Sequence, residues 1–154
     1  VTDLYKFFHN PSFRMYDIRK LAEKYKPSII VFDQLRNVQG FEKRSGTEVE
    51  RLKFLYQEAR QLAAEYGVVL TVHQAGGASE GVDYIPGNNL EGCQTEVQGS
   101  LDVQIMIGRK NDIMEPEHKR YLNIVKNKLP GCRDESLRHG KFEVEIDPVI
   151  SRFK

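Results

Sequence analysis

Hydrophobic residues along the chain follow two different spacings, and this alternation predicts a mixed α/β fold. Helical spacing runs over residues 15–25 and 52–66, and a Thr-x-x-Glu capping box formed by Thr47 and Glu50 precedes the second helix. Short apolar runs typical of strands occur at residues 4–8, 29–33, 68–72, 101–107, 121–126 and 142–146.

The second predicted helix lies between two strands, which is the order of a βαβ unit with parallel strands. The flanking runs, 29–33 and 68–72, are almost entirely apolar, so we expect both strands to be buried on both faces. The strands at 121–126 and 142–146 alternate in polarity, which predicts an antiparallel hairpin at the sheet edge. The expected fold class is therefore α/β, with a parallel-core sheet flanked by helices and a C-terminal antiparallel hairpin.

Residues 75–99 contain six glycines and little apolar periodicity, which predicts a long flexible loop. Loops of this length in compact domains are usually functional or disordered. The length of 154 residues fits one domain, and a net charge of +1 is low for a dedicated nucleic-acid module. Cys93 and Cys132 are far apart without ligand-spaced partners, which favours two free thiols in a reducing, cytoplasmic compartment over a zinc site.

Two polar residues end the central predicted strands. Asp33 follows four apolar residues, at the strand end where open α/β sheets bind ligands, and a carboxylate there can hold the water shell of Mg²⁺ on phosphates. Gln74 ends the neighbouring strand and is expected beside Asp33, where its amide can bind a γ-phosphate. The alternatives are a turn or cap residue for Asp33 and a glutamine satisfied by backbone for Gln74. His73 is expected to be packed or solvent-facing rather than a ligand.

Lys126 and Lys128 stand at the end of another predicted strand. Side chains at this spacing point to the same face of an extended segment, so both cations can reach a phosphate held by a neighbouring subunit. The alternative is a solvated pair of charges that protects an edge strand from aggregation.

In their order and spacing these segments resemble the C-terminal RecA-like ATPase domain of DnaB-type replicative helicases, including phage primase-helicases, from about Pro27 to Lys154. "IIVFDQL" is similar to the Walker B strand, with Asp33 at the Mg²⁺ position. "ERLKFLYQEARQLAAEYGVVLTVHQ" is similar to the next helix and strand, with Gln74 at the γ-phosphate-sensing position. "YLNIVKNKLPG" resembles the segment of trans-acting cations, here Lys126 and Lys128, and "FEVEIDPVISRF" resembles the terminal strands.

"LEGCQTEVQGSLDVQIMIGR" resembles the motif that holds the family's DNA-binding loop. The resemblance implies ATP and Mg²⁺ as cofactors, and single-stranded DNA and the neighbouring subunits of a homo-hexameric ring as partners. No apolar run approaches the roughly 18 residues that a membrane span needs, so no membrane partner is expected. The expected location is the cytoplasm, or the host cytoplasm for a phage protein. The implied DNA-binding residues are Gly76, Gly77, Gly92 and Gln94.

The chain departs from the family pattern in three respects. No G-x-x-x-x-G-K-[ST] occurs, so residues 1–154 are expected to be a partial RecA-like ATPase domain whose P-loop half lies upstream, and inactive alone. Lys128 stands where the family has an arginine finger. The predicted loop has no Lys or Arg, which opposes tight DNA binding, and it carries Glu80, Asp83, Glu91 and Glu96.

The expected function is part of an ATP-driven replicative DNA helicase that couples hydrolysis to translocation on single-stranded DNA. A second hypothesis is another RecA-class ATPase, such as a recombinase or a regulatory ring, with the same sheet and strand-end residues. A third is a non-catalytic RecA-like assembly module, which the missing P-loop favours. A primase or helical domain encoded upstream would favour the helicase.

Overall fold

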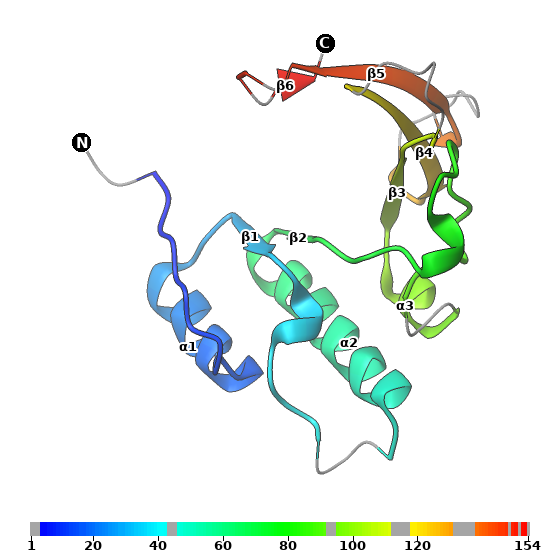
Figure 1. Ribbon diagram of the computed structural model, residues 1–154. Helices are drawn as coiled ribbons and strands as arrows, with labels where there is room; N and C mark the ends of the chain where they lie inside the picture. The colour runs from blue at the N-terminus through cyan, green and yellow to red at the C-terminus, as the bar shows by residue number, and fades with distance from the viewer. Residues whose placement is uncertain are drawn as a thin grey trace. The chain divides into compact units, whose positions relative to one another are not determined.

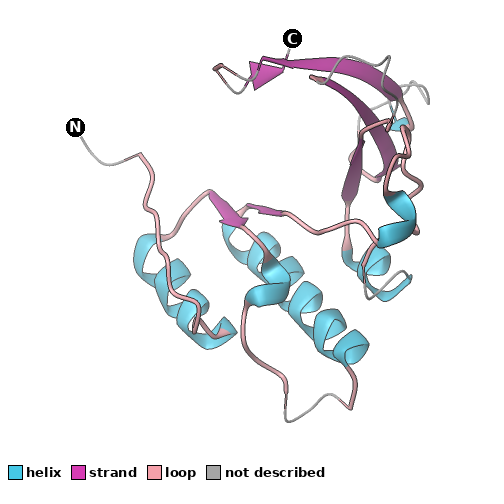
Figure 2. Ribbon diagram, viewed as in Figure 1, coloured by secondary structure: helices cyan, strands magenta, loops and turns pink. Residues whose placement is uncertain are grey.

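The computed structural model describes residues 4–42, 46–91, 95–111, 118–130, 138–147, 149–150 and 152–153. It divides into two units, residues 1–72 and residues 73–154. The first unit holds two long helices and a parallel strand pair, and the second holds an antiparallel sheet (Figures 1 and 2).

Both predicted helices are confirmed. α1 (Met15–Tyr25) ends at Lys26, which has left-handed backbone with φ 44°, directly before Pro27, a residue that cannot continue a helix. α2 (Glu48–Tyr66) begins at Thr47, whose hydroxyl accepts a hydrogen bond from the Glu50 amide at 3.2 Å. The apolar stripe of α2 is buried as predicted, at Leu52, Leu55, Tyr56, Ala59 and Leu62.

β1 (Ile29–Phe32) and β2 (Val68–Thr71) pair in parallel, which confirms the predicted strand order and direction. The prediction that both faces are buried is wrong. One face packs toward α2, whereas side chains on the other are 53–64% exposed. We call this surface the β1–β2 apolar face; it consists of Ile29, Val31, Val68, Leu70 and Val72.

The strand predicted at residues 4–8 is not formed. Leu4, Tyr5 and Phe7 are 97%, 85% and 84% exposed, and the segment has no strand assignment. A strand is stable only where a neighbouring backbone completes its hydrogen bonds, and the apolar pattern alone cannot supply that neighbour.

The second unit is built on a four-stranded antiparallel sheet in the order β3-β4-β5-β6. β4 (Lys119–Asn127) and β5 (Lys141–Asp147) form the predicted antiparallel pair, and β6 (Arg152–Phe153) follows at the edge. β3 (Val103–Gly108) also pairs antiparallel, with β4. The described strands form a two-stranded parallel sheet in the first unit and a four-stranded antiparallel sheet in the second, so the parallel-core sheet expected from the sequence stays a prediction beyond this mixed α/β arrangement.

The segment predicted as a flexible loop packs instead on the β3–β4–β5 sheet. Ala75 and Leu90 form an isolated antiparallel β-bridge, and the short 3-10 helix η2 (Gly77–Ser79) begins two residues after Ala75. The Asn123 amide donates to the Ile85 carbonyl at 2.9 Å, and Ile85 is buried. The described part of this segment, residues 75–91, is therefore packed, because side-chain amides of the sheet satisfy its backbone, whereas residues 92–94 lie outside the described residues.

The opposite face of the same sheet is apolar and open. Ile105 and Ile107 are 52% and 55% exposed, and Phe142 is 40% exposed. Strand register places Leu122 and Ile124 between them. We call these five residues the β3–β5 apolar face.

No helix in the described part of the chain is long and apolar enough to cross a membrane.

Candidate functional site

Asp33 follows β1 directly, at the carboxyl end of the parallel pair. The buried Phe32 precedes it, and the Phe32 carbonyl accepts a hydrogen bond from the Val72 amide at 3.1 Å. Asp33 itself is exposed. The structure thus places this carboxylate in solvent at the strand end that the sequence predicts, the position where open α/β sheets bind ligands.

The segment after Asp33 is anchored on several sides. Leu35 is fully buried, and its amide donates to the Thr71 hydroxyl at 3.4 Å. Leu35 begins the 3-10 helix η1 (Leu35–Asn37), which packs against α2. Further along, the Gln39 amide donates to the Phe13 carbonyl at 2.9 Å. The backbone that leaves Asp33 therefore lies in a fixed path between β2, α2 and the chain before α1.

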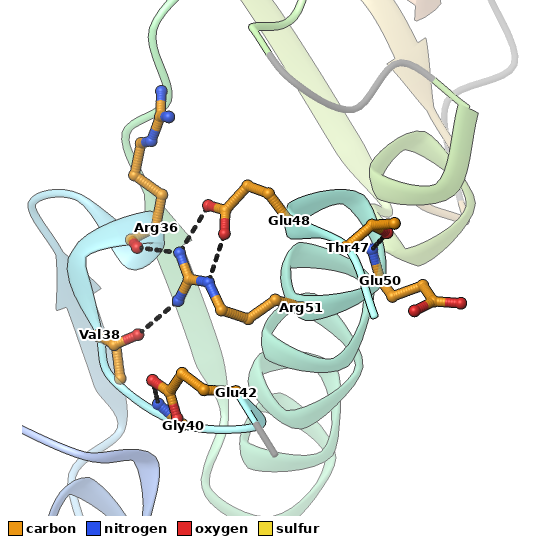
Figure 3. Close-up of polar contacts among 8 residues, drawn as sticks. All are labelled: Arg36, Val38, Gly40, Glu42, Thr47, Glu48, Glu50 and Arg51. Carbon is orange, nitrogen blue, oxygen red and sulfur yellow. Dashed lines mark hydrogen bonds and ion pairs between the residues drawn. The ribbon is translucent and has the colours of Figure 1, made fainter. Parts of the chain in front are cut away.

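Arg51, in the first turn of α2, contacts this segment through two backbone carbonyls (Figure 3). Its Nη1 donates to the Val38 carbonyl at 3.0 Å, and its Nη2 donates to the Arg36 carbonyl at 2.9 Å. The same guanidinium grips both carboxylate oxygens of Glu48, at 2.6 and 2.7 Å. Sequence reasoning missed Arg51, because no local pattern reveals which distant carbonyls a helical arginine will reach.

The ion pair shifts both ionisable groups toward their charged forms. The hydrogen bond from Arg51 lowers the pKa of Glu48, and the hydrogen bond to Glu48 raises the pKa of Arg51. Two further carboxylates accept hydrogen bonds from backbone amides near the start of α2. Glu42 accepts from the Gly40 amide, and this hydrogen bond lowers the pKa of Glu42. Glu50 accepts from the Gly46 amide at 2.7 Å. The capping box is thus confirmed in its hydroxyl half, whereas its carboxylate reaches Gly46 instead of Thr47.

The Glu48–Arg51 pair makes a testable contribution to acid stability. A carboxylate whose pKa is lowered by folding stabilises the protein above its unfolded pKa, and this stabilisation is lost as pH falls through the folded pKa. Because the Glu48 side chain is 50% exposed, we expect Glu48→Gln to lower the free energy of unfolding by less than about 1 kcal/mol at neutral pH, with no difference in acid. Urea unfolding between about pH 7 and about pH 3 measures this.

The control for this prediction is the same substitution in an Arg51→Met background. There Glu48 has lost its partner, so Glu48→Gln should change stability little at any pH. A difference between wild type and Glu48→Gln that persists unchanged into acid would contradict the prediction.

Gln74 belongs to the second unit and Asp33 to the first, so their expected meeting at one strand edge stays a prediction. The Gln74 side chain is exposed, and the backbone carbonyl of Gln74 accepts a hydrogen bond from the Glu91 amide at 3.2 Å. His73 is half-buried with Nε2 at 2.9 Å from the Glu91 carbonyl, which agrees with a packed histidine.

Two of the predicted DNA-binding residues are described, and both lie at the start of the packed loop. The Gly76 amide donates to the Asn89 carbonyl at 2.8 Å, so it is used within the chain. Gly77 is exposed, with open space where a side chain would project. Gly92 and Gln94 lie outside the described residues, so nothing places them.

Lys126 and Lys128 have different surroundings. Lys126 is half-buried in β4 and donates from Nζ to the Gln98 carbonyl in α3 (Thr95–Ser100), a cation on the last turn of a helix. Lys128 is exposed one residue beyond the strand, and its amide donates to the Asp102 carbonyl at 2.8 Å. Of the two predicted trans-acting cations, Lys128 therefore has the more accessible side chain.

The described residues suit a Mg²⁺ ion that keeps most of its water ligands, and they do not form a site in which protein side chains surround a metal. In the described part of the chain no three His, Cys, Asp or Glu side chains gather to hold a metal, and Cys93 and Cys132 lie outside it. Mg²⁺ keeps most of its waters and commonly binds through one or two carboxylates plus phosphates, so Asp33 alone suits it. The phosphate cradle itself is not in this sequence.

Comparison with known proteins gives one kind of match. No protein-family model matches the sequence, and no curated protein matches it. One matching solved structure is that of a DnaB-like replicative helicase, described with its interactions with primase. The TM-score is 0.75 at 14% sequence identity, and the match covers 95% of this chain and 36% of that chain. The ATPase domain of G40P matches with TM-score 0.74, 14% identity, 95% of this chain and 52% of that one.

The chain thus spans about half or less of the structures it resembles. Identity this low establishes the fold alone. The architecture expected from the sequence resemblance is confirmed to that extent: this chain has the mixed α/β fold that is found within a DnaB-like replicative helicase and within the ATPase domain of G40P.

Proposed function

We propose that this chain is part of an ATP-driven DNA helicase motor, the portion of a RecA-like ATPase domain that follows the P-loop half. The observation that carries the proposal is the fold match, which extends over 95% of this chain but only 36% and 52% of the two helicase structures. A site for ATP would then be completed by an upstream part of the same polypeptide.

The two apolar faces support an incomplete domain. Each unit leaves one side of its sheet open, at the β1–β2 apolar face and the β3–β5 apolar face. Monomeric soluble proteins seldom expose contiguous apolar patches of this kind unless another surface covers them. The P-loop half of the domain is the cover that the fold match favours.

In this proposal each predicted residue has one task. Asp33 holds the water shell of Mg²⁺, and Gln74 hydrogen-bonds the γ-phosphate of ATP. Lys128 acts on ATP bound by the next subunit of a homo-hexameric ring, in the cytoplasm of a cell or of a phage host. Lys126, which is bound to α3, supports the strand end rather than the phosphate. Single-stranded DNA binds to the loop that starts at Gly76 and Gly77.

The first test is ATP hydrolysis by the complete polypeptide, meaning this chain together with its upstream half. We expect hydrolysis that requires Mg²⁺ and is accelerated by single-stranded DNA. Hydrolysis without acceleration by DNA would favour another RecA-class ATPase, an outcome consistent with the acidic Glu80, Asp83 and Glu91 of the loop. Absence of hydrolysis and of nucleotide binding would overturn the proposal in favour of an assembly module.

The trans role of Lys128 has its own test. Lys128→Ala in the complete polypeptide should lower ATP hydrolysis at least about tenfold, since a cation on the transferred phosphate is lost. Mixing this variant with Asp33→Asn subunits should restore activity, because about one interface in four then pairs an intact Asp33 with an intact Lys128. If mixing restores nothing, Lys128 does not act across the interface.

A further inference from the structure

We propose that Arg51 is a positioning residue for Asp33, one that fixes the backbone on the downstream side of the Mg²⁺ carboxylate. The inference rests on the function proposed above, because it concerns the same carboxylate. Arg51 does not touch the metal or the nucleotide in this proposal; it acts through the segment that carries Asp33.

The backbone around Asp33 has two anchors. On the upstream side, Phe32 is the last paired residue of β1 and is buried. On the downstream side, the buried Leu35 is followed by the carbonyls of Arg36 and Val38, both held by Arg51. Asp33 thus lies between a strand end and a turn that is held by both Leu35 and Arg51, and the proposal is that loss of the Arg51 contacts loosens the segment that carries the carboxylate.

The chemistry of the contact requires arginine. One planar guanidinium serves two backbone carbonyls and both oxygens of Glu48, and its side chain is only 15% exposed. A lysine ammonium carries the charge but cannot present donors in this fixed fork. The two carbonyls are acceptors that no helix ladder satisfies, so the loss of Arg51 exposes them to water or to a different turn geometry.

The chain offers a matched control in Arg19. Its guanidinium also ties α2 to another segment, through Glu58 at 2.8 Å and Glu65 at 3.1 Å, with the side chain 27% exposed. Arg19 binds α1 to the C-terminal half of α2, where its hydrogen bonds reach Glu58, Gln61 and Glu65. Arg19→Met therefore removes a comparable arginine contact on α2 at a place away from the segment that follows Asp33.

The experiment measures the Mg²⁺ concentration for half-maximal ATP hydrolysis, kcat and thermal stability in the complete polypeptide, for wild type, Arg51→Met, Arg19→Met and Asp33→Asn. We expect Arg51→Met to raise the half-saturating Mg²⁺ concentration about tenfold, the range seen when partners that orient a metal ligand are removed. Arg19→Met should lower the melting temperature and leave the half-saturating concentration at the wild-type value. Simple loss of folded protein lowers the rate without moving this concentration.

The outcomes separate the two proposals. If Arg51→Met lowers only stability, as Arg19→Met does, Arg51 is structural and the inference is overturned, while loss of activity in Asp33→Asn keeps the proposed function. If Asp33→Asn hydrolyses ATP like wild type, Asp33 is not the Mg²⁺ carboxylate and the inference is overturned, while the proposed ATPase function stands. If the wild-type polypeptide neither binds nor hydrolyses ATP, the proposed function fails and the inference fails with it. Where Arg51→Met does not fold, Arg51→Lys is measured in its place and should shift the Mg²⁺ dependence in the same direction.

Discussion

Asp33→Asn is expected to lower Mg²⁺-dependent ATP hydrolysis by the complete polypeptide at least about 100-fold, more than the loss of an orienting partner causes. The carboxylate is exposed at the end of β1, so the substitution removes charge at the ligand edge without removing packing. The folded state should therefore keep its stability. Steady-state hydrolysis across a range of Mg²⁺ concentrations, with thermal unfolding alongside, tests both halves of the expectation.

The matched control is Asp83→Asn. Asp83 is also exposed, and its Oδ1 accepts from the Tyr84 amide, a bond that an asparagine oxygen can keep. This variant should hydrolyse ATP at the wild-type rate. Equal losses in the two variants would show a general charge effect, and an active Asp33→Asn would remove Asp33 from the site.

Gly108→Val is expected to destabilise the second unit by about 3 kcal/mol or more, at the upper end of overpacking costs. A Cβ at Gly108 would lie 1.7 Å from the Asp83 carbonyl oxygen and 2.6 Å from the Val82 carbonyl oxygen. Both obstacles are backbone atoms, so no rotamer change relieves the clash. The loop must lift from β3, and the hydrogen bond between Asn123 and Ile85 is then strained as well.

Hydrogen exchange of the loop amides, together with urea unfolding, measures this effect. Protection should fall in residues 82–90 first, because the loop is displaced before the sheet opens. Gly77→Ala is the control in the same loop, since nothing lies within 4 Å of the added Cβ. Unchanged protection in Gly108→Val would mean that the loop does not pack on the strand as described.

The sequence predicted the elements whose signals are local. α2 has a long apolar stripe, a threonine cap and a terminal glycine, and all three features act within the helix. The apolar runs at β1 and β2 likewise predicted parallel strands, and Asp33 followed from its place at the end of one. These features depend on spacing along the chain, which a single sequence contains.

The features that the sequence did not predict depend on contacts between distant residues. Residues 4–8 have a strand-like pattern but no partner, and the glycine-rich loop is ordered by amides on β3 and β4. The burial of β1 was overestimated because the cover for its outer face is not among the described residues. Arg51 illustrates the same limit, since its carbonyl partners lie 13 and 15 residues away.

The glycine-rich loop also has a consequence for recognition. The Gly87 carbonyl accepts hydrogen bonds from two side chains, Gln98 and Gln104, while Asn123 holds Ile85. These hydrogen bonds hold the loop in one conformation in the unbound structure. A ligand that meets this surface finds a preorganised shape and avoids about 0.5–1.5 kcal/mol of ordering cost for each side chain that would otherwise be immobilised on binding.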